Sequence, residues 1–252
     1  SQRTAAIRSG KVDIAAVSAD TATLLEKTKN VEVKSYQSME YSYLGINVAK
    51  EPFNNVKVRQ AISYAVDRQE IIDSVWKGEA SLTGPISPAM DQWAIDVTKE
   101  PSYKVDQEQA KRLLEEAGFA DGLDTVIYTA STYPDMIDSA QVIQEQLKAV
   151  GINAEIKQLE WGAYIDMWKS KDTDMLVGRN TSGTDPDRST RYFFSTEGSA
   201  NVWNYSNPAF DETVQKAIET IDETERKSLY EQAQKQLIDE NPEKEDEYLE
   251  LM

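Results

Sequence analysis

Two hydrophobic periods alternate along the chain, which predicts strands separated by helices. Alternating or short apolar runs predict strands over residues 12–17, 31–36, 43–48, 123–130, 152–156 and 175–178. Apolar residues spaced three and four apart predict helices over 55–66, 71–76, 106–117, 137–150, 161–168, 213–221 and 229–237. Residues 79–104 and 179–207 show little periodicity and are expected to be loops. This order of elements favours an α/β domain with a largely covered sheet.

Residues typical of helix ends support several of these boundaries. Asn54 or Asn55 is the expected N-cap of the first long helix, and Asp106 followed by Gln109 resembles a capping box. Glycines 78, 118 and 151 stand where helices are expected to stop. The helix that begins near residue 55 either continues or restarts before residue 71.

Composition narrows the classes of function. The chain has 252 residues, of which 40% are hydrophobic, so it can bury a core as one large domain or two small ones. Its net charge of −17 argues against a general nucleic-acid binder and against adsorption to anionic lipid. No apolar run approaches the ~20 residues of a membrane span. The start at Ser1 suggests a mature chain or an excised piece.

The absence of cysteine and histidine removes much of the usual site chemistry. Disulfides, haem ligation, Cys/His zinc sites and Ser-His-Asp triads are excluded. Carboxylates, Lys, Tyr and Ser/Thr remain, but no phosphate-binding loop or EF-hand pattern occurs. Oxygen-ligated Ca or Mg remains possible. Our expectation is no cofactor, no resident metal and no enzyme activity.

Residues 52–68, PFNNVKVRQAISYAVDR, closely resemble the signature of the family 5 extracellular solute-binding proteins. These proteins are the receptors of oligopeptide, dipeptide, glutathione and nickel ABC importers. Residues 41–47 resemble the strand before that signature. Further family motifs are resembled, in the right order, by residues 10–14, 110–118, 144–153 and 229–237. The resemblance covers residues 5–242.

The resemblance implies a type II periplasmic-binding-protein-like lobe, an α/β fold with a mixed sheet flanked by helices. Residues 1–242 would be the second lobe of a two-lobed protein whose first lobe is absent. Residues 243–252 would be an acidic tail that does not match the family. The implied function is capture of a peptide or peptide-like solute outside the cytoplasmic membrane, in the periplasm or as a cell-surface lipoprotein. The implied partners are the importer's membrane subunits and the missing lobe.

The segment after residue 178 is the expected ligand contact, because relatives often have Gly-Trp there, followed by an Asp that pairs with a peptide's amino group. This chain has Arg179 at the Trp position and Ser182 near the Asp position, with Asp185 just beyond. The amine anchor is therefore displaced or absent. The planar guanidinium of Arg179 could instead bind a ligand carboxylate through two hydrogen bonds. The alternative is an ordinary solvent-exposed turn.

Aromatic residues complete the candidate site. Tyr41, Tyr43, Trp161, Trp203 and Tyr205 would stack on an extended ligand, or would pack in the core. A lone lobe would bind weakly or undetectably, since it offers half of the contacts. Two other functions remain open: a protein- or peptide-docking module without a transport role, and an acid-catalysed hydrolase.

Charged residues within the signature suggest a structural role. Arg59 and Asp67 are eight residues apart and would lie near one face of a single helix, and Arg68 follows. A salt bridge that packs the lobe is the simpler interpretation.

Overall fold

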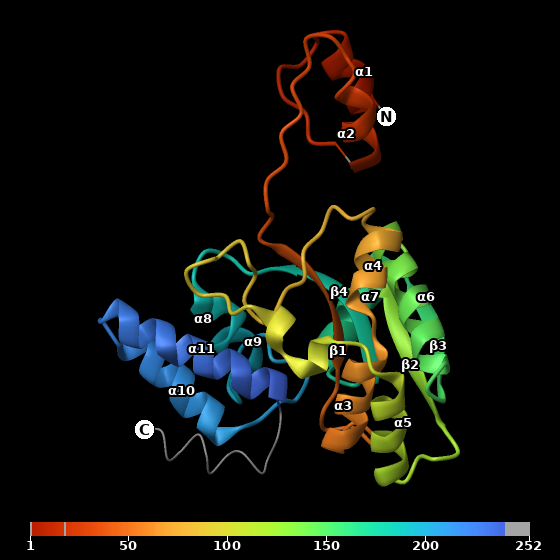
Figure 1. Cartoon of the computed structure of the whole chain (residues 1–252), viewed down its shortest axis with the longest axis vertical. Helices are drawn as coiled ribbons and strands as arrows, with labels where there is room; N and C mark the ends of the chain where they lie inside the picture. The colour runs from red at the N-terminus through yellow and green to blue at the C-terminus, as the bar shows by residue number, and fades with distance from the viewer. Residues whose placement is uncertain (1, 18, 240–252) are drawn as a thin grey trace.

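A four-stranded mixed sheet forms the centre of the protein, whose residues 2–17 and 19–239 are described by a computed structural model. The strands are β1 (Glu40–Ile46), β2 (Leu123–Ala130), β3 (Ile152–Leu159) and β4 (Met175–Thr181), in the order β1-β4-β2-β3. β2 runs parallel to β3 and β4, and β1 runs antiparallel to β4 (Figure 1). The predicted fold class, a mixed sheet flanked by helices, is confirmed.

Five helices accompany the sheet: α3 (Val56–Ala65), α4 (Arg68–Val75), α5 (Gln107–Glu116), α6 (Pro134–Lys148) and α7 (Trp161–Ser170). Their apolar faces and the strands of the sheet contribute most of the main core, which includes Phe53, Ile62, Leu114, Ile127, Met136, Leu147, Ile152 and Leu176. The predicted caps are confirmed at Asn55 for α3 and Asp106 for α5, because each side chain accepts a backbone N–H in the first turn.

Of the two possibilities left open after residue 66, the structure shows that the helix restarts. α3 ends at Ala65, and the side chain of Asp67 caps α4 by accepting the N–H groups of Gln69 and Glu70. Arg59 lies on α3, whereas Asp67 is the N-cap before α4, so the expectation that they share one helix face is wrong. Arg59 donates to the carbonyl oxygen of Phe53 at 2.7 Å.

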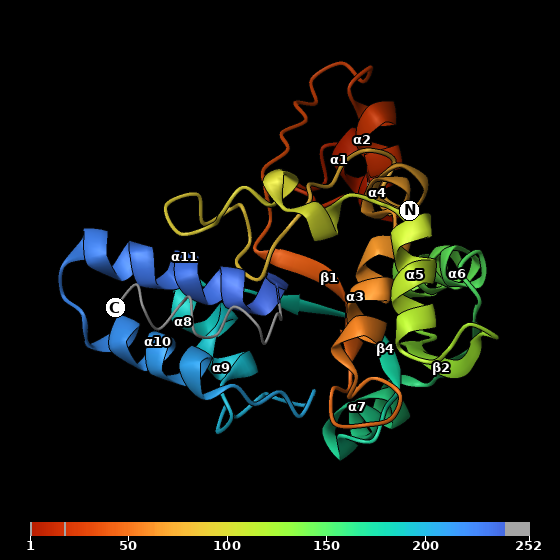
Figure 2. The same cartoon turned by 60° about the horizontal axis from the view of Figure 1, so that its bottom comes forward.

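A second group of helices lies beside the sheet (Figure 2). It contains α8 (Pro186–Ser189), α9 (Arg191–Phe194), α10 (Pro208–Glu219) and α11 (Glu223–Asp239), with apolar clusters of its own around Phe210 and Tyr230. The segment 179–207 was expected to be a loop throughout, but β4 continues to Thr181 and α8 and α9 follow. Ile221, which was expected on the helical face, lies beyond α10 and is 99% exposed.

The segment 79–104 is irregular, as predicted, apart from the short helical turns η1 (Val97–Lys99) and η2 (Pro101–Tyr103). Parts of it belong to the interior, because Ile86, Met90 and Val97 are buried. The amide of Gln234 on α11 holds this segment by donating to the carbonyl oxygen of Trp93 at 2.8 Å.

The N-terminal helices α1 (Gln2–Arg8) and α2 (Ala19–Leu25) stand apart from the sheet and join it through an extended segment (Figure 1). The strands predicted over 12–17 and 31–36 are wrong, and Ile14 and Tyr36 are 91% and 89% exposed. Apolar alternation makes a strand only where a partner edge is available. The assignment of residues 1–242 to one lobe stays a prediction, and the tail 243–252 lies outside the described residues.

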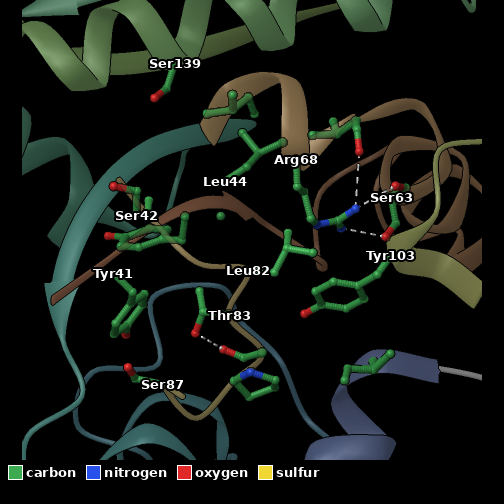
Figure 3. A pocket seen from close by; sticks show the side chains of 18 of the residues that line it. Tyr41, Ser42, Leu44, Ser63, Arg68, Leu82, Thr83, Ser87, Tyr103 and Ser139 are labelled. Carbon is green, nitrogen blue, oxygen red and sulfur yellow. Dashed lines mark hydrogen bonds between the residues drawn. The ribbon is translucent and has the colours of Figure 1, made fainter. Parts of the chain in front are cut away.

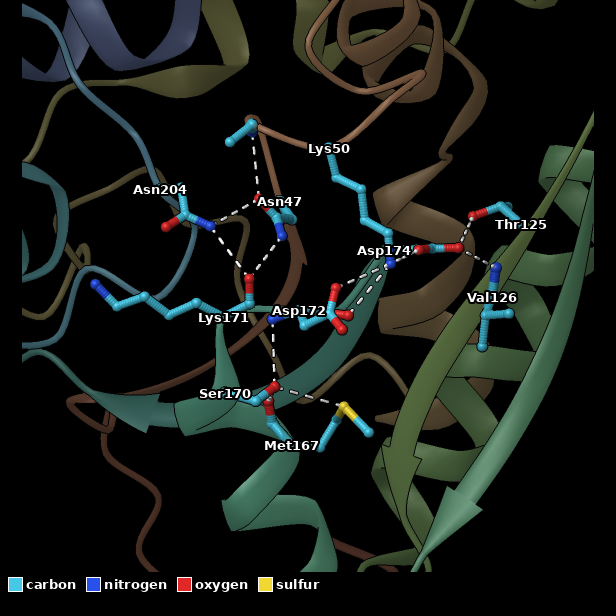
Figure 4. A network of polar contacts seen from close by, with 11 residues as sticks. Asn47, Lys50, Thr125, Val126, Met167, Ser170, Lys171, Asp172, Asp174 and Asn204 are labelled. Carbon is cyan, nitrogen blue, oxygen red and sulfur yellow. Dashed lines mark hydrogen bonds and ion pairs between the residues drawn. The ribbon is translucent and has the colours of Figure 1, made fainter.

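A polar network joins the strands at the end where β4 begins (Figure 4). The carboxylate of Asp174 accepts the N–H of Val126 at 3.1 Å and pairs with the ammonium of Lys50 at 2.8 Å. The hydrogen bond from the Lys50 ammonium to the Asp174 carboxylate, together with the charge of that carboxylate, raises the pKa of Lys50. The buried side chain of Asn47 donates to the carbonyl oxygen of Lys171 at 2.9 Å. The network fixes this end of the sheet, and the opposite end carries the side chains described next.

Candidate functional site

The carboxyl ends of β2, β3 and β4 meet at one edge of the sheet, where β1 begins. In open α/β sheets, ligands bind outside this edge. Tyr133 follows the end of β2, Trp161 follows β3, Arg179 lies near the end of β4, and Glu40 opens β1. The edge is therefore lined with charged and aromatic side chains.

Arg179 already has two carboxylate partners. Its Nη2 lies 2.7 Å from Oε2 of Glu40, and its Nη1 lies 3.6 Å from Oδ2 of Asp135 in the first turn of α6. The guanidinium also lies over the ring of Tyr133, 5.3 Å from the ring centroid. A ligand carboxylate would have to compete with both acidic side chains for this arginine, so the predicted role of Arg179 as a carboxylate receptor stays a prediction.

A cavity of about 1140 Å³ lies beside β1 (Figure 3). Its apolar wall includes Leu44, Ile62, Ile71 and Leu82, and its polar lining includes Ser42, Ser63, Arg68, Tyr103, Ser139 and Arg179. This volume falls just above the usual range for small-ligand sites. The cavity and the carboxyl edge share Glu40, Tyr41 and Arg179, so they form one continuous candidate site.

The sheet separates Tyr43 and Trp203, two of the predicted aromatic residues, from Arg179. Successive strand residues point to opposite faces, and residues paired across antiparallel strands share a face. Ser42 pairs with Arg179, whereas Tyr43 pairs with Gly178 on the other face. There Tyr43 packs edge-on against Trp203, with ring centroids 5.5 Å apart. A ligand that contacts both groups must therefore pass around the edge of the sheet.

Burial keeps the phenols of this aromatic face in the neutral form. Desolvation raises the pKa of Tyr43 to about 12 and also raises the pKa values of Tyr41 and Tyr164. The hydroxyl of Tyr164 donates to the carbonyl oxygen of Val177 at 3.2 Å. These side chains can therefore exchange neutral hydrogen bonds with a ligand but are unsuited to proton abstraction near neutral pH.

The remaining predicted site residues divide between the cavity and other surroundings. Trp203 and Tyr205 line the cavity and are each 8% exposed, so they also serve as core residues. Trp161 is 40% exposed and stacks on Tyr164, with ring centroids 5.5 Å apart. It is placed at the carboxyl edge rather than in the cavity lining.

Ser182 and Asp185 have structural partners. Ser182 is fully buried, and its hydroxyl donates to the carbonyl oxygen of Met39 at 3.1 Å. Asp185 caps α8 and forms an ion pair with Arg226 at 3.2 Å. Neither side chain lines the cavity, so the structure gives the expected ligand roles of these two residues no support.

Arg68 lines the cavity but is occupied by its own chain. Its guanidinium donates to the hydroxyl of Ser63 at 2.9 Å and to the carbonyl oxygens of Ser63 and Ser102, and it stacks on Tyr103. Burial lowers the pKa of Arg68. Arg68 connects α3, α4 and η2 through these hydrogen bonds.

Sequence reasoning missed four residues of the site: Glu40, Tyr133, Asp135 and Ser139. The only available signal was Pro134, which is typical of the first position of a helix and places Asp135 in the first turn of α6. The convergence of Glu40, Tyr133 and Asp135 on Arg179 depends on the order of strands in the sheet, which local periodicity does not encode.

Neither a metal site nor a membrane span stands out in the part of the chain that the structure describes. Within residues 2–17 and 19–239, no group of three or more acidic side chains is arranged to hold a metal ion. The helices of the same ranges include none that is both long and apolar enough to cross a bilayer.

Comparison with known proteins decides the family. A sequence model described as bacterial extracellular solute-binding proteins, family 5 (middle), matches residues 1–201. The chain belongs to this family. The resemblance carried by residues 52–68 is thereby confirmed, and family 5 consists of binding proteins rather than enzymes.

Curated relatives of this family 5 chain are named for small peptides. It is 32% identical over 226 residues to di/tripeptide-binding protein 1 of Pseudomonas aeruginosa, covering 86% of this chain and 42% of the relative. It is 29% identical over 255 residues to the glutathione-binding protein GsiB of Escherichia coli, covering 95% of this chain and 48% of the relative. The chain thus spans about half the length of the curated relatives it matches.

Solved structures agree on the fold. A putative peptide-binding protein AppA from Clostridium difficile matches with a TM-score of 0.84 at 26% identity, over 94% of this chain and 50% of that one. DppA from Helicobacter pylori, solved with the peptide STSA, matches with a TM-score of 0.80 at 29% identity, over 94% and 47% of the two chains.

Proposed function

We propose that this family 5 chain forms one wall of a peptide-binding site in the receptor of an ABC importer. The observation that carries the proposal is the continuous site at the carboxyl edge of the sheet, where Glu40, Tyr41 and Arg179 join a cavity of about 1140 Å³. Relatives named for di- and tripeptides and for glutathione support peptides or peptide-like solutes as the ligand class.

The mechanism is binding without covalent chemistry. A second lobe, supplied by the remainder of the protein, would close over the carboxyl edge, and contacts made only in the closed form would stabilise closure. The closed form would then engage the importer's membrane subunits. This activity belongs outside the cytoplasmic membrane, in the periplasm or on a lipid-anchored receptor at the cell surface.

A thermal-shift screen of the full-length protein that contains this chain tests the proposal. The screen includes dipeptides, tripeptides, oligopeptides, glutathione and sugars. Peptides or glutathione should raise the melting temperature, because ligand at 100 times its Kd stabilises the native state by about 2.7 kcal/mol. The 252-residue chain alone should respond weakly or not at all, since it offers one wall of the site.

A sugar-only response, or no response to any solute, would contradict the proposal. Absence of any small-solute effect would favour the alternative, a docking module that recognises proteins or peptides without a transport role.

A further inference from the structure

The charges around Arg179 do not balance. Glu40 and Asp135 bring two negative charges, whereas Arg179 brings one positive charge. The 3.6 Å separation between Arg179 Nη1 and Asp135 Oδ2 is close enough for an ion pair but too long for a hydrogen bond. Asp135 Oδ2 is buried and has no hydrogen-bond donor among the described residues. Together, Glu40, Asp135 and Arg179 therefore carry one excess negative charge and one carboxylate oxygen that can accept a further hydrogen bond.

The buried hydroxyl of Ser139 is a second, independent observation that points to a ligand. It follows Asp135 by four residues on α6, so both side chains lie on the same face of that helix. Ser139 is 4% exposed, and within the described chain its hydroxyl has no hydrogen-bond partner. Figure 3 shows this hydroxyl directed from α6 toward the cavity. Burying an unpaired hydroxyl is costly, so such a group is expected to have a partner in the functional state.

We propose that Glu40, Asp135 and Ser139 form a seat for a primary ammonium group of the solute, with Arg179 as the positioning residue that holds the two carboxylates. This inference rests on the proposed function. An ammonium group has three donors and one positive charge, so it supplies both what the acidic cluster lacks and a partner for the serine hydroxyl. A ligand carboxylate would instead enter a region that is already negative.

Neighbouring elements maintain this arrangement. Asp135 lies in the first turn of α6, where the partial positive charge of a helix N-terminus attracts negatively charged side chains. Tyr133 lies under the guanidinium of Arg179 and packs edge-on against Trp161, with ring centroids 5.2 Å apart. The arginine is therefore fixed from one side by a ring and from two others by carboxylates.

Calorimetric titration of the full-length protein tests the inference with four peptide probes. These are trialanine, or whichever tripeptide the thermal screen ranks first, together with its N-acetylated form, its C-terminal amide, and an N-acetylated form carrying a central lysine. N-acetylation should weaken binding at least about tenfold because it removes a charge-assisted hydrogen bond, and amidation should change binding less than about threefold. Recovery of binding by the lysine peptide would assign the ammonium to a side chain rather than to the terminus.

Three variants localise the effect. Asp135→Asn and Ser139→Ala should each weaken binding of the free-amine peptide and reduce the penalty of N-acetylation. Asp138→Asn makes the same charge change at an exposed position of α6 and should leave affinity unchanged. If Asp135→Asn does not fold, Ser139→Ala and the acetylated probe still decide the matter.

Each contrary outcome has a distinct meaning. Equal binding of free and acetylated peptides, with loss on amidation, would overturn the ammonium seat and support carboxylate recognition by Arg179, while the proposed function would stand. The ammonium seat would also be overturned if Asp135→Asn and Ser139→Ala both distinguished free from acetylated peptide as strongly as the unmodified protein does. Failure of every peptide to bind would remove the proposed function and this inference together.

Discussion

Tyr43 shows how a single buried phenol links stability to pH. Its pKa is raised from 10.0 to about 12 by burial, so the unfolded chain loses this proton at lower pH than the folded chain. Between pH 10 and 12 the unfolded state therefore binds fewer protons, and the free energy of unfolding should fall as pH rises. One such group contributes a slope of at most about 1.4 kcal/mol per pH unit.

Urea unfolding at several pH values between 10 and 12 measures this slope. Tyr43→Phe should reduce it, although Tyr41 and Tyr164, whose pKa values are also raised, preserve part of it. Tyr36→Phe is the matched control, because the Tyr36 side chain is 89% exposed. If the free energy of unfolding of Tyr43→Phe fell with pH as steeply as that of the unmodified protein, the slope would not be due to Tyr43.

At the scale of single residues, the sequence indicated which residues belong to the candidate site better than it indicated which side chains they contact. Arg179 was singled out by its position after a strand, yet its ion-pair partner Glu40 is 139 residues away in the chain. Tyr41, Tyr43 and Trp203 were expected to surround a ligand together with Arg179, but strand alternation places Tyr43 and Arg179 on opposite faces of the sheet. Such relations arise from strand register, which composition and spacing do not specify.

The break between α3 and α4 depends on one capping side chain. Asp67 Oδ1 accepts the N–H groups of Gln69 and Glu70 at 2.9 and 3.1 Å. Asp67→Ala should lower the free energy of unfolding by about 1 kcal/mol, since it leaves these donors without a protein acceptor. Asp67→Asn keeps the acceptor and should cost much less. Equal losses in the two variants, measured by urea denaturation, would show that the cap is not the cause.

Element prediction succeeded where local pattern and tertiary partner agree. The strands beginning at Leu123, Ile152 and Met175 have apolar alternation or short apolar runs, and each pairs with a neighbour in the sheet. The runs 12–17 and 31–36 have similar patterns but lie in the segment that stands apart from the sheet, and they remain irregular. A strand requires a second edge, which no single run can supply.

The net charge of −17 acts on the molecule as a whole. Self-repulsion destabilises a compact state, and added salt screens it, because the Debye length falls from about 30 Å at 0.01 M to about 10 Å at 0.1 M. The melting temperature should therefore rise between these two NaCl concentrations, and KCl should act equally. A decrease would show that the surface ion pairs outweigh the repulsion, contrary to their usual small contribution.

The family, the α/β class and most boundaries of the sheet body were accessible from the sequence, since ordered motifs and periodicity are local. The cavity was not. It is enclosed by β1, α3, α4, the segment 79–88 and the end of α11, which meet only in the folded molecule. Ser139 illustrates the point, because an ordinary helical serine becomes informative only when its burial and its unpaired hydroxyl are known.

The edge-on packing of Trp161 against Tyr133 also has an optical consequence. Indole emission responds to nearby charge and polarity, and Trp161 is linked through Tyr133 to the guanidinium of Arg179. Its 40% exposure leaves it open to soluble quenchers, whereas Trp203 is largely shielded. The protein thus carries an intrinsic fluorophore at the edge of the sheet, by which occupancy can be followed without a label.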